Sequence, residues 1–145
     1  MILFSDTSAI IKLFVTENGS ESMFVRSEKA IAVAVCWPRT LAELHAALAR
    51  RLRENYVTPA QYDEILGNLK VYRSTWLQVP VLDEALVNVD GLCRRYSLRG
   101  ADALQLCAAI WLAAQNHQVT FASSDQRLLR AASSQGLLVF DRTDP

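Results

Sequence analysis

Short apolar runs alternate along the chain with segments in which apolar residues recur at helical intervals. The runs have the length of β-strands and lie at residues 2–5, 30–36, 76–82, 119–122 and 137–140. The second run, AIAVAVC, shows no polar alternation, which is typical of a strand covered on both faces of a parallel sheet. Pro80 interrupts the third run and removes a backbone donor, so we expect a short strand or an edge strand there.

The segments between the runs predict helices, because their apolar residues lie three or four positions apart. We expect these helices over residues 6–15, 21–29, 38–54, 58–69, 83–96, 101–114 and 125–134. Thr58 with Pro59 forms a favourable cap and first turn. Asp83 is expected to cap the fifth helix, and Gly136 follows the last one, where glycine is common.

Strands separated by helices throughout predict an α/β fold class, an α/β sandwich around a mostly parallel sheet of four to five strands. The chain contains no low-complexity segment or linker, so we expect one domain over residues 1–145. The composition, 51% hydrophobic and 21% charged, agrees with a globular protein. No apolar run reaches the roughly 18 residues that span a bilayer and no signal peptide is apparent, which predicts a cytoplasmic protein without a membrane partner.

Charge and cysteine content exclude several kinds of site. The 15 basic and 15 acidic residues cancel, so net charge does not indicate a nucleic-acid partner and the charges must be examined locally. The three cysteines match neither a disulfide framework nor a zinc pattern. His45 and His117 accompany no nucleophile motif, which argues against hydrolysis through a catalytic triad.

Four acidic residues occupy positions that this fold would bring together. Asp6 and Asp125 each follow an apolar strand, and the carboxyl ends of parallel strands form the ligand-binding edge of an open sheet. Asp102 opens an almost wholly apolar helix, where its carboxylate is expected to be partly desolvated. Glu43 lies about one turn into the helix that follows the second strand. Each acid singly has a structural explanation as a helix cap or a first-turn residue, or as a solvated helix position.

If the four carboxylates share a pocket, a cation must compensate their charge. Two carboxylates about 4 Å apart repel by roughly 4 kcal/mol at an effective dielectric constant near 20. A site of oxygen ligands without Cys or His suits Mg²⁺, with Mn²⁺ as a possible substitute. Such ions lower the pKa of bound water and stabilise charge on a phosphoryl group, which is the chemistry of phosphodiester hydrolysis.

With these residues placed, the chain resembles the PIN-domain family, and within it the VapC-type toxins of bacterial and archaeal toxin-antitoxin pairs. The matching segments are FSDTSAIIKLF, TLAELHAAL, LRGADALQLCAA and FASSDQRLLRAASSQGL, which hold the four acids in the order and approximate spacing of the family. Two departures are Gln105, where many relatives have His, and the sequence Cys36-Trp37-Pro38 before the helix that carries Glu43.

The resemblance implies a three-layer α/β/α fold and a magnesium-dependent endoribonuclease that uses metal-activated water. It implies Asp6, Asp102, Asp125 and Glu43 as catalytic metal ligands, RNA as substrate, a cognate antitoxin as partner, and a homodimer. Arginines that can face the phosphates of RNA are Arg39, Arg50, Arg51, Arg53, Arg94, Arg95, Arg99 and Arg127. For most of them a solvated helix face is the simpler explanation.

Two other functions fit parts of the same pattern. In haloacid-dehalogenase-like phosphatases a strand-end Asp is the nucleophile and a second Asp follows two residues later; here that position is Ser8, which weakens the match. A receiver-like binding module without catalysis would retain the acids only as helix caps, and it would not be stabilised by metal.

Overall fold

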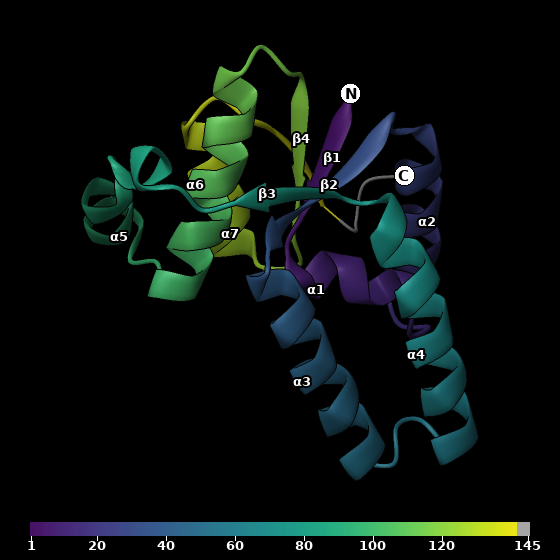
Figure 1. Cartoon of the computed structure of the whole chain (residues 1–145). Coiled ribbons are helices and arrows are strands. Elements are labelled where there is room, and N and C mark those ends of the chain that lie inside the picture. Colours follow the sequence, from purple (N-terminus) through teal and green to yellow (C-terminus); the bar gives the residue numbers. More distant parts are fainter. Residues whose placement is uncertain (142–145) are drawn as a thin grey trace.

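The structure is built around one sheet of five parallel strands in the order β3-β2-β1-β4-β5 (Figure 1). The computed structural model describes residues 1–141. The strands are β1 (Ile2–Ser5), β2 (Ala32–Trp37), β3 (Leu77–Pro80), β4 (Val119–Ala122) and β5 (Leu138–Phe140). The predicted parallel sheet is confirmed, and the strand that contains Pro80 lies at its edge as expected.

Helices cover both faces of the sheet and complete the expected three-layer α/β/α sandwich (Figure 1). The first layer contains α1 (Thr7–Ile10), α2 (Ser20–Lys29), α3 (Arg39–Arg53) and α4 (Pro59–Tyr72), with the 3₁₀ turns η1 (Ile11–Leu13) and η2 (Arg73–Thr75). The opposite layer contains η3 (Asp83–Leu86), α5 (Val89–Tyr96), α6 (Gly100–Ala114) and α7 (Gln126–Ser134).

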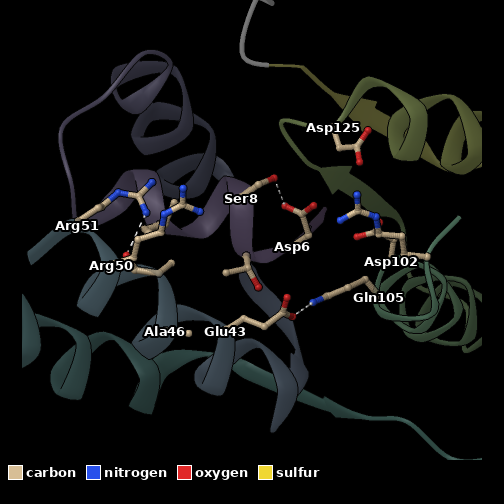
Figure 2. Close-up of a pocket in the computed structure, with 13 residues that line it drawn as sticks. Asp6, Ser8, Glu43, Ala46, Arg50, Arg51, Asp102, Gln105 and Asp125 are labelled. Carbon is tan, nitrogen blue, oxygen red and sulfur yellow. Dashed lines mark hydrogen bonds between the residues drawn. The ribbon is translucent and has the colours of Figure 1, made fainter. Parts of the chain in front are cut away.

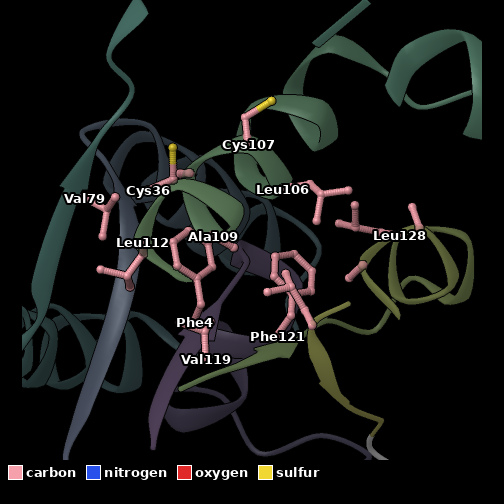
Figure 3. Close-up of a cluster of buried hydrophobic side chains, with 14 of the residues drawn as sticks. Phe4, Cys36, Val79, Leu106, Cys107, Ala109, Leu112, Val119, Phe121 and Leu128 are labelled. Carbon is pink, nitrogen blue, oxygen red and sulfur yellow. The ribbon is translucent and has the colours of Figure 1, made fainter. Parts of the chain in front are cut away.

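Alternate side chains of the strands pack into different layers. Phe4 and Phe121 lie on the face covered by α6, where their rings stack with centroids 5.7 Å apart (Figure 3). On the other face, Val35 packs in the cluster that contains Leu44 of α3 and Leu69 of α4. Helix α6 is buried along much of its length, as its apolar sequence predicts. No helix of residues 1–141 is long and apolar enough to cross a membrane.

The strand order places a ligand-binding edge where β1 meets β4. From β1 the chain passes to β2 and β3 on one side of the sheet, and it returns through α5 and α6 to β4 on the other side. Ligands of open parallel sheets bind outside the carboxyl ends of the strands at such a change of direction. Ser5 and Ala122, the last residues of β1 and β4, are paired in register, so the segments that leave these strands start side by side.

The predicted helices need correction at two places. The segment 6–15 is a single turn of α-helix followed by the 3₁₀ turn η1. The segment 83–96 is divided into η3 and α5, and Asp83 is the first residue of η3 rather than a cap. Two valines and an asparagine at residues 87–89 have weak helix propensity, which explains the break. The capping box at Thr58 and the glycine after α7, with a φ of 86°, agree with the sequence.

Candidate active site

Asp6 lies directly after β1, and its carboxylate is held by three donors. The Ser8 hydroxyl and the Ala9 amide both donate to Oδ1, at 2.7 and 3.0 Å. The Ser123 hydroxyl, which follows β4, donates to Oδ2 at 2.5 Å. The residue is only 6% exposed, so the carboxylate has a fixed position at the carboxyl edge of the sheet.

Burial raises the pKa of Asp6 to about 6. The hydrogen bonds from Ser123, Ser8 and Ala9 act in the opposite direction, and the charge of Asp102 adds to the rise. The hydrogen bonds therefore offset only part of the cost of removing the carboxylate from water. A cation beside Asp6 would favour its ionised form.

Asp102 and Asp125 approach from the opposite helical layer. Asp102 is in the first turn of α6, and Asp125 is the N-cap of α7, with Oδ1 accepting from the amides of Arg127 and Leu128. Burial raises the pKa of Asp102 above its ordinary value, and the charges of Asp125 and Glu43 raise it further. Arg99 and Arg39 oppose this rise. The acids thus repel one another, and nearby arginines compensate only in part.

Glu43 reaches the same region from α3 and is oriented by two side chains. Its Oε1 accepts from Gln105 Nε2 at 3.2 Å and forms an ion pair with Arg39 Nε at 3.2 Å. Gln105 Nε2 also donates to the hydroxyl of Thr40 at 3.3 Å. Only the amide nitrogen can donate to a carboxylate, which fixes the orientation of this side chain. Gln105, a departure from the family pattern, therefore joins α6 to α3 at the site.

The four acids line one open pocket of about 640 Å³ (Figure 2). The remaining lining residues are Thr7, Ser8, Ile11, Ala46, Ala47, Arg50, Arg51, Arg99 and Gln105. Figure 2 shows the carboxylates of Asp6, Asp102 and Asp125 on one side, with Arg50 and Arg51 across the pocket. The structure therefore brings together all four acids named from the sequence, whereas their catalytic roles stay predictions.

The carboxylates of this pocket suit a magnesium ion that keeps several waters better than an ion enclosed by protein ligands alone. Within residues 1–141, no group of three or more Asp, Glu, His or Cys side chains is already close enough to hold an ion together. Mg²⁺ commonly takes one or two carboxylates and keeps several waters, so a preassembled cage is unnecessary. Thr7 Oγ1 and Gln105 Oε1 are buried without a hydrogen-bond partner among the described residues, as expected where a hydrated ion completes the network.

Two contributors to the site could not be identified from the sequence as such. Ser123 donates to Asp6, and this bond depends on the pairing of β1 with β4, which the local sequence does not give. Arg130 was not among the candidate arginines, although it lies in a second hollow beside the acids. Its spacing of three residues from Arg127 on one helix was the available signal.

The comparisons with known proteins agree with this architecture. No family model matches the chain. Ribonuclease VapC45 of Mycobacterium tuberculosis is 27% identical over 141 residues, which cover 95% of this chain and 94% of the relative. The resemblance to VapC proteins drawn from the four motifs is thus confirmed over almost the whole length.

Two solved structures have the same fold. The structure of VapBC2 from Rickettsia felis, bound to a DNA fragment from the promoter, matches with a TM-score of 0.66 and 14% identity, covering 97% of this chain and 98% of that one. FitAcB from Neisseria gonorrhoeae matches with a TM-score of 0.64 and 18% identity, covering 98% of each chain. At these identities the likeness concerns the fold alone, which is the predicted PIN-like α/β/α sandwich.

Proposed function

We propose that this homologue of the VapC ribonucleases is an endoribonuclease toxin that hydrolyses RNA phosphodiester bonds with magnesium. The observation that carries the proposal is the pocket in which Asp6, Glu43, Asp102 and Asp125 converge from four separate segments. Burial first, and then the charges of neighbouring acids, raise the pKa values of Asp6 and Asp102, as expected of carboxylates whose charge a bound cation would compensate. The relatedness to VapC45 supplies the ribonuclease activity.

Asp6 and Asp102 are the first candidates for direct metal ligands, followed by Asp125 and Glu43. When bound, Mg²⁺ would supply an activated water and neutralise charge on the reacting phosphate. Ser8 and Ser123 hold Asp6 against rotation, and Gln105 with Arg39 holds Glu43. Such supporting contacts position metal ligands and commonly affect activity by about 10- to 100-fold. Mn²⁺ is expected to substitute because it prefers the same oxygen ligands.

A cognate antitoxin is the proposed protein partner, and a homodimer the proposed assembly of the toxin. The antitoxin is supported by the structural neighbour from Rickettsia felis, which is VapBC2 with promoter DNA, and by the relatedness to VapC proteins, whereas the homodimer follows from the family resemblance. We infer a cytoplasmic location from the RNA substrate that we propose.

A specific observation argues against each of the two competing functions. A phosphatase with Asp6 as nucleophile would need a second Asp two residues later, but that position is Ser8, whose hydroxyl donates to Asp6 Oδ1. The binding module without catalysis has better support, because Asp6 and Asp125 do cap α1 and α7. Capping does not explain why Glu43 and Asp102 face the same pocket.

Cleavage of RNA by the purified chain tests the proposal. Wild type freed of antitoxin should cleave transfer, ribosomal or messenger RNA with Mg²⁺ or Mn²⁺ and should be inactive in EDTA. Asp6→Asn and Asp102→Asn, purified in the same way, should be inactive. Asp63→Asn is the matched control, because Asp63 is exposed on α4 and lies outside this pocket. Absence of metal-dependent cleavage by wild type, or equal cleavage by all four proteins, would contradict the proposal.

A further inference from the structure

A second hollow, of about 540 Å³, adjoins the carboxylate pocket on the side of α7. Arg99, Asp102 and Asp125 line both spaces, so the two hollows lie side by side. Its other charged lining residues are Arg127 and Arg130. The volume falls within the range of ligand-binding pockets. The acidic centre therefore opens directly onto a region where arginines outnumber acids.

The arginines on the two sides of the acids differ in their partners. Across the carboxylate pocket, Arg50 forms an ion pair with Glu54 and Arg51 forms one with Glu17, each at 3.0 Å. In the second hollow, none of the three arginines forms an ion pair with a residue of the described part of the chain. The guanidinium of Arg127 donates one hydrogen bond, to the carbonyl of Ser97 at 3.4 Å. Arg127 and Arg130 thus have no acidic partner within the described residues and can meet an external anion, whereas Arg99 also acts on Asp102.

Helix geometry presents two of these arginines together. Arg127 and Arg130 lie three residues apart on α7, a spacing that places side chains on the same helix face. Both are exposed, whereas Leu128 and Leu129 between them are buried and anchor the helix. The guanidinium group offers a planar fork of donors that matches two phosphate oxygens. The pair is therefore suited to a phosphate rather than to a compact cation or an apolar ligand.

We propose that the hollow of Arg99, Arg127 and Arg130 binds the backbone phosphate next to the scissile one in a single-stranded RNA substrate. This assignment rests on the proposed ribonuclease function. Arg99, in both hollows, would lie between the two phosphates, and it also lowers the pKa of Asp102. Arg127 and Arg130 would hold the neighbouring phosphate at a distance from the reacting bond. Arg50 and Arg51 on the α3 side contribute less to RNA affinity, because they already have acidic partners.

The test uses Arg127→Gln/Arg130→Gln, a double variant that removes both charges and retains helix propensity. Arg94→Gln is the matched control, since Arg94 is 77% exposed on α5 and lines neither hollow. All proteins, including the parent, carry Asp6→Asn to prevent cleavage. Binding of a fluorescently labelled oligouridylate is followed by anisotropy with Mg²⁺ at several salt concentrations, and circular dichroism checks that each protein is folded.

The double variant should raise the Kd about tenfold, whereas the control should change it less than about twofold. The dependence of log K on log salt should become shallower by roughly 0.7 to 1.4, which corresponds to one or two released phosphate contacts. Arg127→Lys/Arg130→Lys should recover most of this salt dependence, because charge is retained while the fork is lost. In the active background, the Gln variant should raise KM and leave kcat close to that of wild type.

Three results would overturn the assignment, and they separate it from the proposed function. If the parent binds RNA and the double variant binds equally well, the hollow is not a phosphate site although the ribonuclease proposal survives. If the double variant binds RNA like the parent but no longer binds the antitoxin, the hollow is a protein contact. If the parent binds no RNA and wild type cleaves none, both proposals fail.

Discussion

Asp6 and Asp125 follow the same local pattern and yet occupy different environments. Each stands after a buried strand and caps the next helix through backbone amides. Asp6 follows the last residue of β1 directly and is buried, with side-chain donors from Ser8 and Ser123. Asp125 is exposed, and two serines separate it from the end of β4. The same local pattern thus leaves one carboxylate buried at the sheet edge and the other exposed to solvent.

This difference indicates a division of roles within one pocket. A buried carboxylate held by three donors is a rigid ligand whose charge is costly without a cation. Water screens the charge of an exposed cap, so this charge is less costly without a cation. Because the side chain is exposed, it can also adjust its position when an ion or a phosphate binds. We expect substitutions at Asp6 to affect activity and the pH dependence of stability strongly, and those at Asp125 to do so weakly.

The largest expected effect is on catalysis. Asp6→Asn should lower kcat/KM for RNA cleavage by at least about a hundredfold, because a direct ligand should matter no less than the groups that support it. Asp125→Asn should lower it by roughly tenfold, as expected of an adjustable ligand. Steady-state kinetics with a labelled RNA at saturating Mg²⁺ measures both. Equal losses for the two variants would remove the distinction between them.

The next largest effect of Asp6→Asn is on the pH dependence of the unfolding free energy, measured in EDTA. The pKa of Asp6 is raised from 3.8 to about 6 in the folded chain, so folding favours the protonated acid. The stabilisation of the folded chain by the protonated Asp6 is fully present below pH 3.8 and is lost as the pH rises to about 6. At pH 7, Asp6→Asn should therefore exceed wild type in unfolding free energy by about 2 to 3 kcal/mol, and the gap should close toward pH 4.

Urea unfolding from pH 4 to pH 8 measures this gap. Asp63→Asn should follow wild type throughout, because Asp63 is exposed. A difference between wild type and Asp6→Asn that stays constant over the whole range would show that burial does not shift this carboxyl group.

A smaller effect is expected at Ser123, which contacts both acids. Its hydroxyl donates to Asp6 Oδ2 and accepts from the amide of Asp125 at 3.0 Å. Ser123→Ala should lower the unfolding free energy by about 1 to 2 kcal/mol and activity by roughly tenfold, because the buried carboxylate of Asp6 and the amide of Asp125 each lose a hydrogen bond. Ser133→Ala, at an exposed position of α7, is the control for chemical denaturation and kinetics. An unchanged Ser123→Ala protein would argue that this link is unimportant.

The smallest effect concerns the cap of α7. Asp125→Asn should change the unfolding free energy by no more than about 0.5 kcal/mol, since Asn caps helices as well as Asp does. Asp125→Ala should cost about 1 kcal/mol, because the amides of Arg127 and Leu128 lose their acceptor. Thermal unfolding of the two variants at pH 7 compares them. A cost for Asn as large as that for Ala would mean that the charge, rather than the cap, stabilises the helix.

Much of this architecture could be predicted from the sequence because the strands are short continuous apolar runs. Such runs identify a covered parallel sheet, and the acids after them then fall at its carboxyl edge. The break in the helix at residues 87–89 could not be predicted from periodicity, because the apolar pattern continues across it. Only the weak helix propensities of these residues argue for a break.

Contacts between distant segments could not be predicted from the sequence. The Gln105 bridge to Glu43 depends on the approach of α6 to α3, and the bond from Ser123 to Asp6 depends on the register of two strands. The unequal burial of Asp6 and Asp125 has the same origin, because local sequence identifies both only as caps. Their separation in depth is a tertiary property.

The central claim, that these acids form a divalent-metal site, is tested most directly by titrating Mg²⁺ into the RNA-free chain. Unfolding free energy is measured for wild type, Asp6→Asn/Asp102→Asn and Asp63→Asn. Wild type and Asp63→Asn should gain about 2.7 kcal/mol at a Mg²⁺ concentration one hundred times the Kd, whereas the double variant should gain almost nothing. Equal gains in all three proteins, or none in any, would contradict the account.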